Sequence, residues 1–284
     1  MGMSKAVNML AELAKQGIKI NDGDYIGDDG LLYCGKCHTR KQVRINLPDG
    51  TEVTPHCLCK CEAEKAEKEK KDLEDRERLL TIERYRSVGF TDKELKKCRF
   101  SADDGINKYV TDIAKNYVDN FSEFKKAGKG LIFYGGVGTG KTFLASCIAN
   151  ELIDKCIPCC VTNFSRIVNK LTGMFEGKQE YIDSLNNFSL LVIDDFAMER
   201  STEYVNEIVY NVIDSRYRSG KPLIVTTNLS KKDLDNPPDI DKQRIYSRIK
   251  EMCFPVEVKG TDRRSRNNDG DIMLKLFEKR GGEE

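Results

Sequence analysis

The sequence of 284 residues lacks any long hydrophobic run and any excess of charge of one sign. No apolar stretch approaches the roughly 20 residues that a membrane-spanning helix requires, so we expect no membrane association. Lysine and arginine together number 47, against 46 for aspartate and glutamate. The whole molecule therefore has no field that would attract nucleic acid or a membrane, and any site for a polyanion must be a local patch.

The amino terminus also lacks a secretion signal, because MGMSKAVNML has too few consecutive apolar residues. Gly2 would suit a myristoyl chain, but Ala6 breaks the rest of that motif. We therefore expect a cytoplasmic protein.

Cysteine is the residue in surplus, with 11 copies, of which five fall between positions 34 and 61. In a reducing cytoplasm, clustered cysteines favour metal ligation over disulfides. Cys34 and Cys37 form one pair of ligands. The second pair is drawn from the segment HCLCKC, which holds His56, Cys57, Cys59 and Cys61. Two such pairs provide the four ligands of a structural Zn²⁺ site, and free buried or redox-active cysteines are the alternative.

Composition divides the chain into three segments. Residues 1–61 hold the five clustered cysteines and are expected to form a zinc-binding module. The metal must largely stabilise this module, because so short a segment buries little surface. Residues 62–99 begin with strong helix formers and no glycine or proline up to position 86, which predicts a charged connecting helix, with a flexible linker as the alternative. Residues 100–284 alternate strands with helices, which predicts an α/β domain with a parallel sheet.

Four short apolar runs are the expected strands of this sheet, at 131–134, 158–163, 190–193 and 223–227. Strands that are almost wholly apolar are typical of a sheet covered on both faces. Helices are expected at 142–154, 165–175, 202–219 and 243–252, followed by a last strand at 254–258.

The segment GGVGTGKTF lies between an apolar strand and a helix, which is the context of a phosphate-binding loop. Its glycines let backbone N–H groups face phosphate oxygens, and the helix adds its positive amino-terminal dipole. We expect Lys141 to contact the β- and γ-phosphates of ATP and Thr142 to bind Mg²⁺. A chance match in a glycine-rich turn is the alternative. The residues expected to bind nucleotide are Gly135, Gly136, Val137, Gly138, Thr139, Gly140, Lys141, Thr142 and Phe143.

Polar residues end two of the later strands. The run LLVIDDF closes with Asp194 and Asp195, at the edge where open α/β sheets bind ligands. We expect Asp194 to hold Mg²⁺ with Thr142, and Asp195 to activate the attacking water as a general base. Asn228 ends PLIVTTN and could orient that water. Surface acids and an ordinary turn are the alternatives.

Two groups of arginines follow. Arg244 and Arg248 lie four residues apart, on one face of an expected helix. One of them could act on the ATP of a neighbouring subunit, where a cation is needed for the charge that develops on the transferred phosphate, and surface ion pairs are the alternative. Arg263, Arg264 and Arg266 could reach back to the nucleotide or bind nucleic acid phosphate.

In this order, the motifs GGVGTGKT, LLVIDDF, VTTN, RIYSRI and KGTDRR resemble those of the AAA+ ATPases of the DnaC/DnaI type, the bacterial and phage loaders of the replicative helicase. The transposition helper IstB is similar. The resemblance covers roughly residues 85–270 and extends to the cysteine module, since phage-type loaders often carry an amino-terminal zinc-binding segment. It implies an AAA+ P-loop fold and a slow ATPase regulated by a partner or by DNA.

The resemblance also implies residue roles. Asn228 looks like sensor 1, Arg264 like the sensor 2 arginine, and Arg248, or else Arg244, like the arginine finger. Asp195 departs from many AAA+ proteins, which have glutamate there, and its shorter reach puts the rate of hydrolysis in question. The implied partners are a hexameric replicative helicase, single-stranded DNA and further copies of the chain.

The implied function is ATP-dependent loading of the replicative helicase onto single-stranded DNA during DNA replication. One alternative is an IstB-like transposition helper ATPase that binds DNA and recruits a transposase. Another is an adaptor whose ATP site is a slow switch. For the cysteine module, docking to the helicase is favoured over a DNA-binding finger. The basis for the finger is a group of residues close to the cysteines, Lys36, His38, Arg40, Lys41 and Arg44.

Overall fold

The computed structural model describes residues 20–197, 202–260 and 262–263. The chain divides into two compact units, Met1–Leu79 and Leu80–Glu284, and the division falls within one helix.

The first unit contains two short antiparallel hairpins. β1 (Tyr25–Ile26) pairs with β2 (Leu32–Tyr33), and β3 (Ile45–Asn46) pairs with β4 (Glu52–Val53). Its buried apolar side chains are few and include Leu31, Leu32 and two cysteines, Cys34 and Cys59. Such a small interior supplies little hydrophobic stabilisation, so the unit depends on other interactions.

A long helix, α2 (Lys60–Gly89), continues from the first unit into the second. Residues 63–80 are all exposed. Ion pairs four residues apart, such as Lys65 with Glu69, lie along the helix surface. A helix without a packed face depends on the strong helix formers and charge pairs that the sequence supplies here.

Gly89 ends α2 against the second unit. A Cβ atom at this position would lie 2.1 Å from the carbonyl oxygen of Cys159, so the close approach requires glycine. Phe90 then forms a parallel bridge with Val161. The end of α2 is thereby fixed to the strand that contains Cys159 and Val161.

A five-stranded parallel sheet forms the centre of the second unit, in the order β6-β7-β8-β5-β9. The strands are β5 (Gly130–Tyr134), β6 (Cys159–Asn163), β7 (Leu190–Phe196), β8 (Leu223–Thr227) and β9 (Cys253–Glu257). The first four residues of β5, β6 and β7 are buried, because helices cover both faces of the sheet. The predicted α/β fold with a parallel sheet is confirmed.

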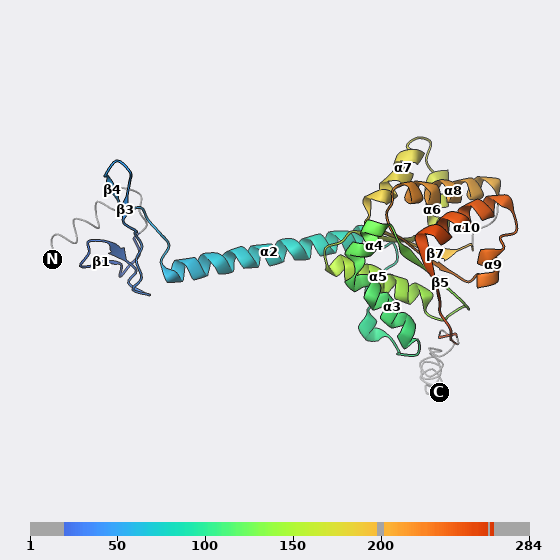
Figure 1. Cartoon of the computed structure of the whole chain (residues 1–284), viewed down its shortest axis with the longest axis horizontal. Helices are drawn as coiled ribbons and strands as arrows, with labels where there is room; N and C mark the ends of the chain where they lie inside the picture. Colours follow the sequence, from blue (N-terminus) through green and yellow to red (C-terminus); the bar gives the residue numbers. More distant parts are fainter. Residues whose placement is uncertain (1–19, 198–201, 261, 264–284) are drawn as a thin grey trace, which may run out of the picture. The chain divides into compact units, whose positions relative to one another are not determined.

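Helices form a layer on each face of this sheet, with α3 and α5 on one side and α8 and α10 on the other (Figure 1). One layer packs around Phe133 and Val192 and consists of α3 (Lys108–Asp119), α4 (Phe121–Ala127) and α5 (Lys141–Asp154). The other packs around Leu191 and Val225 and consists of α6 (Phe164–Thr172), α7 (Lys178–Ser184), α8 (Glu203–Arg218) and α10 (Ile240–Met252).

Short helical segments complete the second unit. They are η1 (Leu95–Lys97), η2 (Phe100–Ala102), η3 (Leu185–Asn187) and α9 (Lys231–Asp235). Within the described ranges, no helix has both the length and the apolar composition needed to span a bilayer.

Candidate nucleotide and metal sites

The phosphate-binding loop joins the end of β5 to the start of α5. Lys141 is buried, and its ammonium group donates to the carbonyl oxygens of Gly135 at 3.0 Å and Gly136 at 2.6 Å. Thr139 Oγ1 donates to the same Gly136 oxygen at 3.0 Å. The loop thus holds its lysine inward while α5 begins within the loop, so the helix amino terminus is available to an anion.

Asp194 lies where β7 reaches the loop. Its Oδ1 accepts hydrogen bonds from Thr142 Oγ1 at 2.8 Å and from Thr226 Oγ1 at 2.5 Å. Burial raises the pKa of Asp194, and the charge of Asp195 adds to this effect, whereas the two hydroxyl donors oppose it. One carboxylate with two hydroxyls is a set of oxygen ligands of the kind that Mg²⁺ prefers, so these residues fit the expected cation.

Thr226 is a site residue that the sequence analysis missed. Its hydroxyl also accepts a hydrogen bond from the backbone N–H of Asp195 at 3.0 Å. Asp195 has a φ of 51°, a backbone conformation that few residues other than glycine adopt. Thr226 therefore holds both acids in place. Its sequence signal is the run VTTN, because β7 and β8 are neighbours and end at the same edge of the sheet.

A cavity of about 830 Å³ lies beside the loop. Its lining brings together several expected site residues, namely Val137, Gly138, Gly140, Lys141, Thr142, Phe143, Asp195 and Asn228. Gly135 and Gly136 instead line a second cavity, of about 420 Å³, which Asn228 also lines. Arg263, which the sequence analysis offered as a residue that reaches back to the nucleotide, also lines the large cavity. The rest of this wall, which no motif predicted, is formed by Leu95, Cys98, Ala102 and Asp104.

The arrangement of the loop, the acids and the cavity agrees with the family that the sequence matches. Residues 62–269, well over half of the chain, match the family described as IstB-like ATP binding protein. The chain belongs to this family. Three parts of this IstB-like protein suit ATP: the lysine of the loop, the paired acids and the cavity beside the loop.

Two curated relatives are replicative helicase loaders. DnaI of Bacillus subtilis (strain 168) is 28% identical over 169 residues, which cover 55% of this chain and 53% of DnaI. DnaC of Escherichia coli (strain K12) is 28% identical over 125 residues, which cover 43% of this chain and 50% of DnaC. The chain therefore spans about half the length of these loaders. The phage-like element PBSX protein XkdC of Bacillus subtilis matches over more, with 28% identity over 221 residues, 75% of this chain and 77% of XkdC.

Solved structures show the same fold. A crystal structure of DnaI has a TM-score of 0.52 at 24% identity and covers 64% of this chain and 100% of its own. A crystal structure of the DnaC helicase loader has a TM-score of 0.50 at 24% identity and covers 59% of this chain and 100% of its own. Over the part of the chain that they cover, this IstB-like protein thus has the α/β fold of these structures.

The arginines expected to complete the site differ in their surroundings. Arg248 Nη2 lies 2.7 Å from Asp214 Oδ1, and its guanidinium lies 4.6 Å from the ring centroid of Tyr210. Arg244, one turn earlier on α10, is exposed. Neither lines the cavity of its own chain. Arg264 and Arg266 lie outside the described residues.

Four cysteines of the first unit come together. The sulfur atoms of Cys34, Cys37, Cys59 and Cys61 all lie within 4.8 Å of one another. The Sγ atom of Cys61 is 3.6 Å from that of Cys34 and 3.3 Å from that of Cys59. Four Zn–S bonds of about 2.3 Å in a tetrahedron place the sulfurs roughly 3.8 Å apart, so the cluster could hold zinc.

Cys57 and His56 are not part of this cluster. The Cys57 thiol points to the carbonyl oxygen of Arg40, 3.7 Å away, and His56 forms a backbone bridge with Gln42. Cys61 joins the cluster because α2 begins at Lys60 and its first turn returns the chain toward Cys59. The structure thereby selects Cys59 and Cys61 from the three candidates for the second ligand pair.

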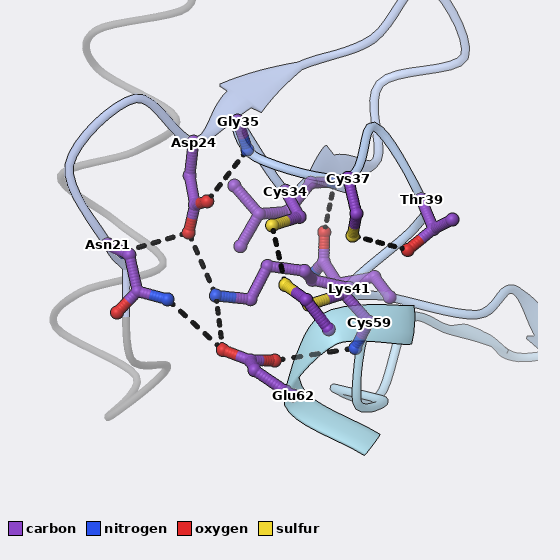
Figure 2. Close-up of polar contacts among 12 residues, drawn as sticks. Asn21, Asp24, Cys34, Gly35, Cys37, Thr39, Lys41, Cys59 and Glu62 are labelled. Carbon is purple, nitrogen blue, oxygen red and sulfur yellow. Dashed lines mark hydrogen bonds and ion pairs between the residues drawn. The ribbon is translucent and has the colours of Figure 1, made fainter. Parts of the chain in front are cut away.

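A buried ion cluster lies beside these cysteines (Figure 2). Lys41 is fully buried, and its Nζ lies 2.8 Å from Asp24 Oδ2 and 3.0 Å from Glu62 Oε1. Burial by itself lowers the pKa of Lys41, but hydrogen bonds to the two carboxylates outweigh burial and raise the pKa above its ordinary value. The lysine therefore stays charged. Asp24 Oδ1 accepts from the N–H of Gly35 at 3.1 Å, and Glu62 Oε2 from that of Cys59 at 3.3 Å. The ion cluster therefore ties both ligand pairs to the start of α2.

Proposed function

We propose that the protein is an ATP-dependent loader that places a hexameric replicative helicase on single-stranded DNA during DNA replication. The observation that supports this most is the similarity to relatives named replicative helicase loaders. The nucleotide site lies within residues 62–269, the segment that matches the family. The cysteine module ahead of that segment offers a separate surface for a partner.

In this proposal the cavity beside the loop binds ATP with Mg²⁺ and hydrolyses it slowly. Lys141 and the loop N–H groups hold the phosphates, while Thr142 and Asp194 bind the cation. Asp195, fixed by Thr226, takes the proton of the attacking water, and Asn228 orients that water as sensor 1. Bound Mg²⁺ would supply positive charge where negative charge develops during the reaction.

A second copy of the chain is proposed to complete this site with an arginine finger. Arg244 is the better candidate, because it is exposed while the charge of Arg248 is already paired with Asp214. Arg264 keeps its proposed role as the sensor 2 arginine.

The segments have separate proposed roles. Residues 1–61 form a module that docks on the helicase, residues 62–99 connect it, and residues 100–284 form the ATPase domain. Zinc bound by Cys34, Cys37, Cys59 and Cys61 stabilises the module.

Size-exclusion chromatography of the chain with its cognate replicative helicase, with and without ATP, tests the proposed function. We expect a stable complex. Cys59→Ser, which removes a proposed zinc ligand, should abolish the complex, whereas Cys57→Ser should keep it because Cys57 lies outside the cluster. No association of the unaltered chain in either condition would contradict the proposal.

A transposition helper is the second candidate, because the matching family is described as IstB-like. Affinity capture from the native host separates the two functions. Recovery of a replicative helicase supports loading, and recovery of a transposase supports the transposition helper.

A further inference from the structure

A second ion cluster, formed by Arg263, Asp103 and Asp104, lies at the wall of the nucleotide cavity. The proposed function does not use it. Arg263 Nη2 lies 3.1 Å from Asp104 Oδ1, and Arg263 Nη1 lies 3.7 Å from Asp103 Oδ1. The two acids directly follow η2, whereas Arg263 comes from the segment after β9. Arg263 and Asp104 both line the cavity, so the ion cluster faces the space proposed for ATP.

Arg263 also lies directly against the phosphate-binding loop. Its backbone N–H donates to the carbonyl oxygen of Gly138 at 3.0 Å. A Cβ atom at Gly138 would lie 1.8 Å from Asp262 Oδ1, so glycine is what lets this segment approach the loop. The guanidinium Nη1 would lie 3.0 Å from a Cβ atom at Gly140. From this position, the guanidinium is within reach of both the acids and an anion held by the loop.

Asp103 makes the pairing difficult to break. Its side chain is only 8% exposed, and its Oδ2 accepts a hydrogen bond from Thr111 Oγ1 at 2.8 Å. Its Oδ1 is buried and has no hydrogen-bond donor among the described residues. Because a buried carboxylate without a counter-ion is strongly unfavourable, departure of Arg263 requires Asp103 to move or to gain water.

The charges of the ion cluster oppose a nucleotide. Two carboxylates and one guanidinium give the cluster a net negative charge, and Asp104 and Arg263 face the cavity. A nucleotide carries several negative charges, so the acids repel it and compete with it for Arg263.

We propose that Asp103 and Asp104 form a latch that withholds Arg263 from bound nucleotide, and that release of this latch when nucleotide binds frees η2 to move. The latch rests on the proposed function, because it requires a nucleotide in the cavity. It lowers nucleotide affinity and links binding to the segment between α2 and α3. Asn150 of α5 donates to the carbonyl oxygens of Leu95 and Cys98 in that segment, at 2.8 Å and 3.1 Å, so the loop helix contacts it directly.

Titration of a fluorescent ATP analogue into four full-length chains tests the latch. The chains are the unaltered protein, Asp104→Asn, Arg263→Ala and the double variant. Asp104→Asn should bind the analogue roughly two- to fivefold more tightly, the range expected for a partly exposed ion pair. In the Arg263→Ala background, Asp104→Asn should increase the affinity for the analogue by a smaller factor, because no guanidinium has to leave the acid. Asp112→Asn, which removes an exposed acid on α3, is the matched control and should change little.

Weaker binding by Asp104→Asn would overturn the latch, because the acid would then position Arg263 for the nucleotide. A gain as large or larger in the Arg263→Ala background would also overturn it, because the acid would then act only by repelling phosphate. Failure of the unaltered chain to bind the analogue would contradict both the ATP site and the latch, whereas binding without these differences contradicts the latch alone.

Hydrogen exchange of the backbone over residues 95–111 gives a second readout. We expect exchange in the unaltered chain to become faster when the analogue binds. Asp104→Asn should already exchange faster without it. Identical exchange in the free and bound states would contradict release of η2.

Discussion

At the scale of single residues, Asp194 is a buried carboxylate, and its charge is costly although two hydroxyls donate to it. Burial raises the pKa of Asp194, and the charge of Asp195 adds to the shift. A carboxyl whose pKa is raised on folding contributes stability at low pH, and this contribution is lost as the pH rises through the folded-state value. We expect Asp194→Asn, which carries no charge, to raise the melting temperature by roughly 2–4 °C at about pH 8. The difference from the unaltered chain should vanish as the pH falls toward the ordinary aspartate value of 3.8.

Thermal unfolding followed by circular dichroism between about pH 4 and pH 8, without nucleotide or metal, measures this difference. Asp112→Asn provides the control, because it also replaces a carboxyl with an amide, but at an exposed position on α3. If Asp194→Asn is less stable than the unaltered chain at the upper pH, the hydrogen bonds of the carboxylate outweigh its burial.

The residues of this site differ in how well the sequence predicts them. Lys141 and Thr142 belong to a contiguous motif, so their placement needs only the strand before them and the helix after them. Thr226 acts through an acid on a neighbouring strand, and only the pairing of β7 with β8 brings its hydroxyl to Asp194. The choice of Cys61 over Cys57 similarly depends on where α2 begins, and helix boundaries are the least predictable feature of a helix.

At the scale of elements, the start of α2 depends on the ion cluster around Lys41. Lys41→Met keeps most of the side-chain volume but leaves Asp24 buried without its cation. The cluster also accepts hydrogen bonds from the N–H groups of Gly35, which lies between Cys34 and Cys37, and of Cys59, a proposed ligand. Without Lys41, the geometry of both ligand pairs should therefore loosen. We expect the affinity for zinc to fall roughly 10- to 100-fold, the range seen when partners of metal ligands are removed.

Competition between the full-length chain and a coloured zinc chelator measures that affinity. Lys36→Met is the matched control, because Lys36 lies between Cys34 and Cys37 but is exposed. Equal zinc retention by Lys41→Met and the unaltered chain would show that the cysteines alone determine the site.

Elements of the second unit differ in predictability for physical reasons. The strands β5 to β8 are found from the sequence because burial on both faces makes them almost wholly apolar. The helices α7 and α9 are missed because they are short and depend on tertiary contacts. The helix α3 is not among the expected helices. The spacing of its buried residues nevertheless predicts a helix, because they recur at positions 110, 114, 117 and 118.

At the scale of the whole molecule, strand order brings Arg263 to the phosphate-binding loop. β9 joins the sheet beside β5, and Val258 N–H donates to the carbonyl oxygen of Tyr134 at 2.8 Å. This pairing carries Arg263 to Gly138. The sequence alone could not give this placement, because a motif gives the order of residues but not the register of a strand that joins the sheet from far along the chain. Arg264, which the resemblance favours as the sensor, lies outside the described residues.

The proposed arginine finger requires more than one molecule. If Arg244 acts on the ATP of a neighbouring copy, pure Arg244→Ala and pure Lys141→Ala should both lack ATP hydrolysis. The first variant lacks the finger, and the second lacks the lysine of the loop. An equimolar mixture should recover activity, because about a quarter of its interfaces then combine an intact loop with an intact arginine.

Steady-state ATP hydrolysis of the mixture, at a fixed total protein concentration, measures this recovery. Arg248→Ala provides the contrast: Arg248 is bound to Asp214 and lies over Tyr210 within its own chain, so its loss should lower stability more than it affects complementation. Recovery with Arg248→Ala but not with Arg244→Ala would assign the finger to Arg248. Absence of recovery with both variants would mean that each site works within a single copy. Because neither arginine lines the cavity of its own chain, we expect recovery with Arg244→Ala, and hence a site that only an assembly completes.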